Sequence, residues 1–169
     1  MRVLVAFLVA LLISGFTLPA PASAKGDIVS FRQFPFPPGT IIVRTAERKL
    51  YLLLPDGKAI RYPIAVGRAG MQWQGMARIV EKRIKPDWAP PPPDGETWDP
   101  KKVIAGGSPA NPMGAAAMVL TGRTYAIHGT NEPWLIGQFV SHGCSRMYNA
   151  DVLTLYKLAP KGTLVVVLR

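Results

Sequence analysis

The chain has 169 residues, a formal net charge of +10, one cysteine and two histidines. This length suits one domain with a real core, and a lone cysteine excludes a disulfide framework and a cysteine-based zinc site. The charge favours an anionic envelope polymer or membrane surface as surroundings, or it serves solubility alone. No compact basic run or nucleic-acid motif is present, so we expect no nucleic-acid partner.

The first segment of the chain is typical of an export signal. Met1-Arg2 gives a positive start, residues 3–13 form an apolar run, and Ala22-Ser23-Ala24 is a small-residue cleavage pattern. We therefore expect residues 1–24 to be a signal peptide that is removed on export. The apolar run is shorter than the roughly 20 residues of a membrane span, so we expect no stable span in the mature chain. An uncleaved anchor is the alternative.

After a short entry segment, residues 25–40, the remainder at 41–169 is predicted to be one mainly β domain. Short apolar and β-branched runs separated by turn residues predict strands, and Pro55-Asp56-Gly57 predicts a hairpin turn. The C-terminal run is apolar throughout, which indicates a central strand. The predicted strands cover residues 41–43, 50–54, 59–66, 77–84, 116–120, 124–127 and 163–168.

Helices are expected only beside the cysteine. Asn149 is a favourable N-cap residue, and the apolar face of the following helix would be formed by Val152, Leu153 and Tyr156. A second short helix is predicted over residues 133–139.

The proline-rich segment 86–112 is predicted to be a long loop, since proline lacks the amide donor that a sheet ladder needs. Loops of this length in a compact domain tend to be functional. We expect Trp88 and Trp98 to pack this loop onto the domain, with a substrate-groove wall as the alternative.

The residues around the single cysteine predict a nucleophile. Cys144 lies in Ser141-His142-Gly143-Cys144-Ser145-Arg146-Met147, and His128 follows a predicted strand upstream. An unpaired thiol is unusual in an exported protein, and an imidazole that takes its proton leaves a thiolate–imidazolium pair able to attack a carbonyl. His142 repeats on the same side of an extended chain as Cys144, whereas His128 would approach from another strand. A buried structural thiol and a redox sensor are the alternatives, although a sensor would lack a resolving cysteine.

Two neighbours of the cysteine have candidate roles. Gly143 permits a tight backbone path, which makes the amides of Gly143 and Cys144 candidate donors to an oxyanion. Arg146 is suited to bind a substrate carboxylate, or else to hold the loop and helix at Asn149.

This stretch, together with His128-Gly129-Thr130-Asn131-Glu132-Pro133-Trp134-Leu135-Ile136-Gly137 and Asn111-Pro112-Met113-Gly114, resembles the catalytic region of the YkuD-type L,D-transpeptidases, the ErfK/YbiS-like family. The similarity extends over roughly residues 41–168. It implies a β-sandwich or open, barrel-like domain with one or two short helices beside the active-site loop, and it implies no metal or organic cofactor.

The resemblance also implies roles for individual residues. Cys144 would be the nucleophile, His128 the proton acceptor and donor, and the backbone carbonyl of Gly129 would orient the imidazole. His142 would line the site, and Gly143 would offer a backbone donor to the oxyanion. The candidate substrate-binding residues are Arg146, Ser141, Trp134 and Thr130, although the Trp134 indole is expected first to cover the core beneath the turn at Pro133.

The implied reaction is acyl transfer on peptidoglycan stem peptides in a bacterial periplasm or cell envelope. Cys144 would attack the carbonyl between the third and fourth stem residues and release D-alanine. The thioester would pass to an amine of a neighbouring stem (a 3–3 cross-link), to an amine of an envelope protein, or to water, as in an L,D-carboxypeptidase. A non-catalytic peptidoglycan-binding domain is the alternative from another class.

One segment departs from the family pattern. Members often carry T-P-x-G-x-[FY] after a V-G element, whereas this chain has Gln72-Trp73-Gln74-Gly75-Met76-Ala77. Gly75 is kept but the Thr-Pro pair is missing, so we expect the local loop and part of the donor groove to differ.

Overall fold

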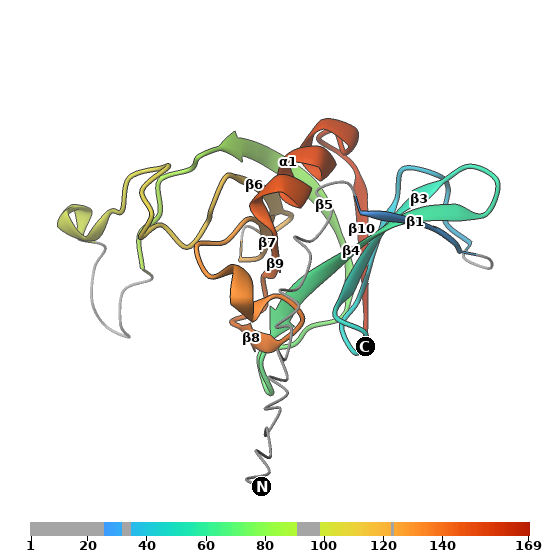
Figure 1. Ribbon diagram of the computed structural model, residues 1–169, viewed down its shortest axis with the longest axis horizontal. Coiled ribbons are helices and arrows are strands. Elements are labelled where there is room, and N and C mark those ends of the chain that lie inside the picture. The colour runs from blue at the N-terminus through green and yellow to red at the C-terminus, as the bar shows by residue number, and fades with distance from the viewer. Residues whose placement is uncertain (1–25, 32–34, 91–98, 123) are drawn as a thin grey trace, which may run out of the picture.

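The strands of the computed structural model form one strongly curved sheet, and the helix α1 (Asn149–Leu158) lies beside it (Figure 1). The structure describes residues 26–31, 35–90, 99–122 and 124–169; the predicted signal peptide and Trp98 lie outside these ranges. The strands are β1 (Asp27–Ser30), β2 (Ile41–Arg44), β3 (Lys49–Leu54), β4 (Lys58–Gly67), β5 (Gly75–Ile84), β6 (Ala116–Leu120), β7 (Ala126–His128), β8 (Phe139–Ser141), β9 (Ser145–Met147) and β10 (Leu164–Leu168).

The sheet closes on itself like a barrel. Its order is β1-β4-β3-β2-β10-β5-β6-β7-β9, and β9 also pairs with β4, while β8 pairs with β4 off this path. The mainly β, barrel-like fold predicted from the sequence is therefore confirmed. Strand β10 lies between β2 and β5, as its apolar run predicts. The entry segment supplies β1, which pairs with β4.

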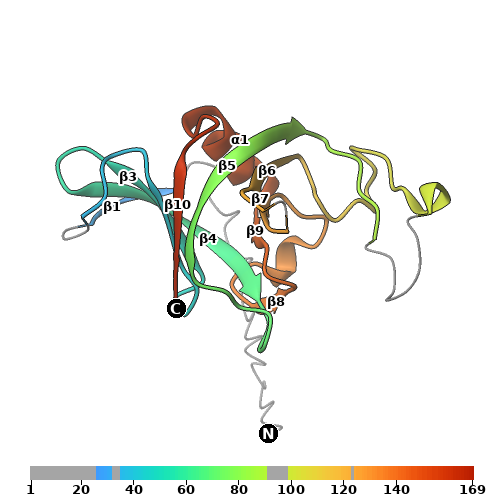
Figure 2. The ribbon, with the colours of Figure 1, turned by 180° about the vertical axis from the view of Figure 1, so that it is seen from behind.

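Strand β5 turns the sheet from one side of the barrel to the other (Figure 2). Its first part pairs with β10 and its second part with β6, and the register shifts between Ile79 and Glu81. Such a bulge bends a strand and increases its twist.

Apolar residues on both faces of β2 and β10 explain their continuous apolar sequence. Ile41 and Val43 belong to the main core cluster, whereas Ile42 faces a second cluster. That second cluster is covered by partly buried side chains that include Val29 and Phe31. A strand buried on both faces reads as an unbroken apolar run rather than an alternating one.

The predicted hairpin turn between β3 and β4 is confirmed. Leu54 pairs with Lys58 across it, and Asp56 and Gly57 have φ values of 61° and 65°. Aspartate and glycine are among the residues that tolerate this left-handed conformation best.

The helix α1 (Asn149–Leu158) begins one residue earlier than predicted. Its N-cap is Tyr148, which makes no side-chain capping bond, and Asn149 is already helical. The expected N-cap role of Asn149 is therefore wrong, because its amide bonds to other segments. The core face consists of Val152, Leu155 and Ala159.

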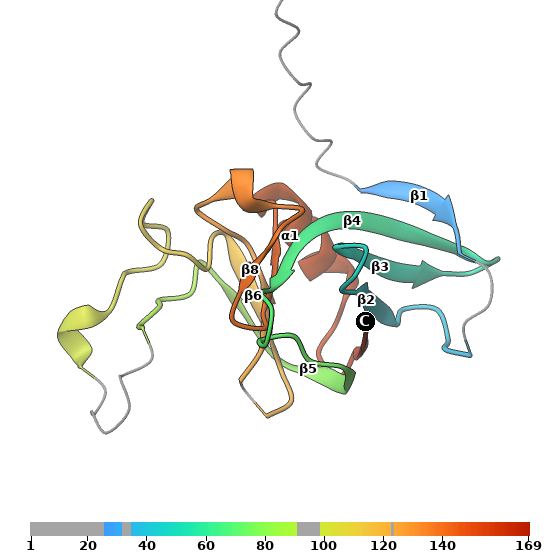
Figure 3. The same ribbon diagram turned by 90° about the horizontal axis from the view of Figure 1, so that it is seen from below.

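The remaining differences concern short elements. The helix predicted over 133–139 is only a 3-10 turn, η2 (Pro133–Leu135), after which the chain enters β8, and the strand predicted over 124–127 begins two residues later. The long loop contains a second 3-10 turn, η1 (Pro100–Lys102), and a backbone bridge between Trp88 and Ile104. Figures 1 and 3 show this loop at the end of the molecule opposite β1, β2 and β3.

Candidate active site

The two short strands β7 and β9 bring the candidate base and nucleophile together. They run parallel, with Ile127 paired to Ser145 and His128 paired to Arg146. Because side chains alternate along a strand, Ile127 enters the core while His128 and Arg146 point the other way. Cys144, two residues before Arg146, points to the same side as these two.

These side chains open into a cleft of about 660 Å³. Its lining includes the large side chains of Trp88, Met113 and Tyr125 together with several polar residues. Trp88 therefore lines the groove, as the alternative interpretation of this residue proposed. The residues predicted from the sequence that line the cleft are His128, Ser141, His142, Cys144 and Arg146.

Gly143 is required by the geometry of the turn before Cys144. Its φ is +113°, which side chains rarely adopt, and a Cβ would collide with the ring of Tyr125. Both observations agree with the tight backbone path expected at this glycine.

Ser141 stabilises the same turn through hydrogen bonds to its backbone. It is buried, and its hydroxyl donates to the Cys144 carbonyl (2.6 Å) while accepting the Gly143 N–H (3.1 Å). The hydroxyl thus makes two hydrogen bonds to the backbone of this turn, although Ser141 also lines the cleft. The Gly143 N–H is likewise engaged, so the expectation that it donates to an oxyanion does not hold in this arrangement.

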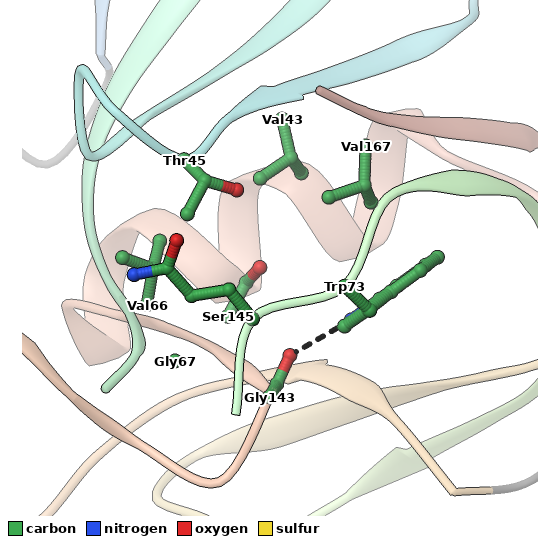
Figure 4. Close-up of a pocket in the computed structure, with 9 residues that line it drawn as sticks. Val43, Thr45, Val66, Gly67, Trp73, Gly143, Ser145 and Val167 are labelled. Carbon is green, nitrogen blue, oxygen red and sulfur yellow. Dashed lines mark hydrogen bonds between the residues drawn. The ribbon is translucent and has the colours of Figure 1, made fainter. Parts of the chain in front are cut away.

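Trp73 holds the outer side of the turn. Its Nε1 donates to the Gly143 carbonyl at 3.0 Å (Figure 4), and its ring stacks on Tyr125 with centroids 4.9 Å apart and planes within 6°. No sequence motif pointed to this contact, although Trp73 lies in the segment that departs from the family pattern.

Asn149 joins the helix to the segment after His128. Its Oδ1 accepts the N–H groups of Ala115 (2.9 Å) and Thr130 (3.1 Å), and its Nδ2 donates to the Thr130 carbonyl (2.9 Å). These three bonds fix the backbone that follows β7, and with it the end of the strand that carries His128.

Arg146 is held by an acidic partner rather than by the Asn149 region. Its Nη1 lies 3.1 Å from Oε2 of Glu132, and its side chain also lines the cleft. The alternative that Arg146 ties down the loop at Asn149 is therefore wrong, and Glu132 is a partner that the sequence analysis missed.

Two candidate substrate contacts lie elsewhere. Thr130 is buried, accepts the Glu132 N–H through its hydroxyl (3.0 Å), and lines a separate cavity with Lys85 and Asn131. Trp134 is 68% exposed, so it neither covers the core nor lines the cysteine cleft. The expectation that Trp134 covers the core is therefore wrong, and neither Trp134 nor Thr130 lines the cleft that contains Cys144.

Burial shifts the pKa values of His128 and Cys144 in opposite directions, each toward the neutral form. It lowers the pKa of His128 to about 4, assisted by the charge of Arg146, while backbone groups of Gly129 and Pro112 oppose the shift. Burial raises the pKa of the Cys144 thiol, opposed by the Ala126 backbone and by Arg146. These shifts favour a protonated thiol beside a neutral imidazole, which can accept the proton as the sulfur attacks.

The imidazole of His128 is almost fully buried. Nδ1 of His128 is buried and makes no hydrogen bond of good geometry with the described residues, although the Gly129 backbone lies close enough to raise the pKa of the ring. Catalytic hydrogen bonds are often poorly aligned before a substrate binds. No group of three or more His, Cys, Asp or Glu side chains suited to a metal ion occurs among the described residues.

Comparison with known proteins decides the family. A family model for the L,D-transpeptidase catalytic domain matches residues 38–167. The chain belongs to the YkuD-type L,D-transpeptidase family. It is 49% identical over 133 residues to the putative L,D-transpeptidase YqjB of Bacillus subtilis, covering 75% of this chain and 69% of that protein.

Other relatives are longer. The chain is 39% identical over 137 residues to the probable L,D-transpeptidase ErfK/SrfK of Escherichia coli, covering 74% of this chain but only 42% of that protein. The chain is also 39% identical over 155 residues to a putative L,D-transpeptidase of Fuscovulum blasticum. That match covers 86% of this chain and 82% of the other protein. This chain therefore spans less than half the length of ErfK/SrfK.

Solved structures agree on the fold. The catalytic domain of the Enterococcus faecium L,D-transpeptidase acylated by ertapenem has a TM-score of 0.57 at 20% identity, covering 76% of this chain and 95% of that one. L,D-transpeptidase 3 from Mycobacterium tuberculosis has a TM-score of 0.57 at 18% identity, covering 77% and 60%. In the described part of the chain, no helix has the length and apolar content to cross a bilayer.

Proposed function

We propose that this L,D-transpeptidase family member uses Cys144 to transfer an acyl group from a peptidoglycan stem peptide to an amine. The main support is the pairing of β7 with β9, which directs His128 and Cys144 into one cleft. The family supplies the reaction class, and the cleft supplies room for an extended peptide.

The acylation step follows from the two neutral groups. The thiol proton passes to the His128 imidazole as Sγ bonds to the carbonyl carbon between stem residues three and four, which leaves an oxyanion. When the intermediate collapses, the C–N bond breaks, and the imidazolium returns its proton to the departing amine of D-alanine. A thioester on Cys144 remains.

The same groups carry out deacylation. An acceptor amine attacks the thioester carbon and loses a proton to His128, and the sulfur leaves and regains that proton. Arg146 lies in the cleft two residues from the nucleophile, where its charge suits a carboxylate of the stem peptide. His142 is exposed in the same cleft and lines the path to the sulfur.

The acceptor is decided by what enters the cleft after D-alanine leaves. An amine of a second stem gives a 3–3 cross-link, an amine of an envelope protein gives a tethered protein, and water gives a tripeptide. We propose the cross-link as the main product, in an exported protein of a bacterial envelope.

Muropeptide analysis tests this proposal. Purified protein would be incubated with disaccharide tetrapeptides, and the products separated and identified by mass. We expect 3–3 dimers and free D-alanine with the wild type, and neither with Cys144→Ala. Tripeptides alone would assign a carboxypeptidase, and binding to sacculi without any product would assign a non-catalytic wall-binding domain.

A further inference from the structure

The peptide bond between Gly143 and Cys144 is held in one orientation from outside the cleft. Trp73 Nε1 donates to the carbonyl of this peptide at 3.0 Å, and Figure 4 shows the indole directed at that oxygen. The N–H of the same peptide belongs to Cys144. The described residues contain no cis peptide, so this N–H points away from Trp73.

The two sides of the turn face different spaces. Gly143 and Ser145 line a small pocket that also contains Trp73. Cys144 and Arg146 line the large cleft. A carbonyl directed toward Trp73 therefore directs the Cys144 N–H toward the side where the sulfur lies.

The orientation of the Gly143–Cys144 peptide must be held by an outside contact, because Gly143 has no Cβ to restrict its backbone. A peptide that follows glycine rotates more easily than others, and a rotated peptide would turn its carbonyl, instead of the N–H, toward the cleft. The neighbouring donor cannot compensate, since the Gly143 N–H is bonded to Ser141. The indole is itself held by its stacking on Tyr125.

We propose that Trp73 is a positioning residue that fixes the Gly143–Cys144 peptide so that the Cys144 N–H donates to the oxyanion of the acylation step. This inference rests on the proposed function. It also gives a role to the segment that lacks the Thr-Pro pair of its relatives, because Trp73 lies there. The indole does not line the cleft that contains Cys144, so its effect is transmitted through the backbone.

Two reactions of the same sulfur separate this role from a general effect on the thiol. Acylation by a carbapenem passes through an oxyanion, whereas alkylation by iodoacetamide does not. Cys144 is the only cysteine, so both rates report on one atom. Trp73→Phe keeps an aromatic ring against Tyr125 and loses the N–H donor.

We expect Trp73→Phe to slow carbapenem acylation about tenfold or more, since losing a whole oxyanion donor costs about 10²–10³ in rate. The alkylation rate should stay within about twofold of the wild type. The turnover number with tetrapeptide should fall while KM stays nearly unchanged. Gln72→Ala is the matched control, because Gln72 lines the same small pocket and makes no hydrogen bond with the described residues.

The results distinguish the two proposals. Equal loss of acylation and alkylation in a folded Trp73→Phe variant would mean that Trp73 places the sulfur rather than the N–H, and unchanged acylation would remove its role altogether. Either result overturns this inference alone, whereas a wild type that never acylates overturns the proposed function. If Trp73→Phe does not fold, benzothienylalanine at position 73 keeps the bicyclic shape with sulfur in place of N–H, and the same rates decide.

Discussion

His128 and Arg146 are paired across the parallel ladder of β7 and β9. A permanent positive charge therefore lies beside the proposed base and two residues from the proposed nucleophile. This charge lowers the pKa of both groups, so it favours the thiolate that attacks and disfavours the imidazolium that forms. Glu132 binds the guanidinium on one side and moderates this field.

Replacing the guanidinium should move the titration of the thiol. In Arg146→Met the pKa of Cys144 loses a lowering influence and rises, so the pH at which alkylation reaches half its maximal rate shifts upward. The measurement is the iodoacetamide rate from pH 6 to 10. Lys157→Met, which removes an exposed charge from the last turn of α1, should leave the profile in place. A downward shift in Arg146→Met would contradict the assigned sign.

A methyl group at position 143 should displace the turn that carries Cys144 and so reduce acylation. In Gly143→Ala the Cβ meets the Tyr125 ring at a φ of +113°, so the turn must move. We expect acylation to fall by at least about 10²-fold, given the effect of a misplaced reacting group, with destabilisation of about 1–3 kcal/mol. Gly122→Ala is the comparison, since it shares a positive φ but has open space around its Cβ. Wild-type acylation in Gly143→Ala would contradict the required glycine.

Removing the Asn149 amide should loosen the backbone behind His128. Asn149→Ala removes the side-chain partner of two N–H donors and one carbonyl at a partly exposed site, which predicts a loss of about 1–2 kcal/mol of unfolding free energy together with lower activity. Asn149→Asp keeps the acceptor and should lose less. Urea denaturation measures the difference, and equal losses in both variants would show that the acceptor contributes nothing.

The buried carboxyl of Asp151 should make stability fall as the pH rises. Burial, and then the charge of Asp27, raise its pKa to about 6 from 3.8, and its Oδ1 has no hydrogen-bond partner among the described residues. The native state therefore binds this proton more tightly than the unfolded chain, and its stabilising effect is lost between about pH 4 and 6.

Asp151→Asn should consequently stabilise the protein at pH 7.5 by about 1 kcal/mol after allowance for solvent screening. The gain should shrink at pH 4.5, where the wild-type carboxyl is largely protonated. Urea unfolding at both pH values tests the sign. A gain that is larger at pH 4.5 would contradict it.

Some of this architecture is visible in the sequence because the signals are local. The β3–β4 hairpin follows from Pro55-Asp56-Gly57, and the central position of β10 follows from its apolar run. Strands β8 and β9 were not predicted, because three residues give too little periodicity. Their pairing with β4 and β7 depends on contacts between distant parts of the chain.

In the candidate site, too, some features could be predicted from local sequence and others could not. The motif around Cys144 predicted which residues would line the cleft, but not which hydrogen bonds would already be used. Ser141 and Asn149 both have side chains that suit several roles, and only the folded chain shows that they bond to backbone groups. Trp73 bonds to Gly143, and Glu132 bonds to Arg146. Both partners are distant in sequence, so no local sequence pattern predicts these contacts.

The most direct test of the account is the intact mass of the protein after exposure to a carbapenem. We predict a stable increase equal to one carbapenem, located on Cys144 by peptide mapping, absent in Cys144→Ala and formed at least about 10²-fold more slowly in His128→Ala. An unmodified wild-type protein, or an adduct that forms as fast without the residue-128 imidazole, would contradict the assignment of these two residues as nucleophile and base.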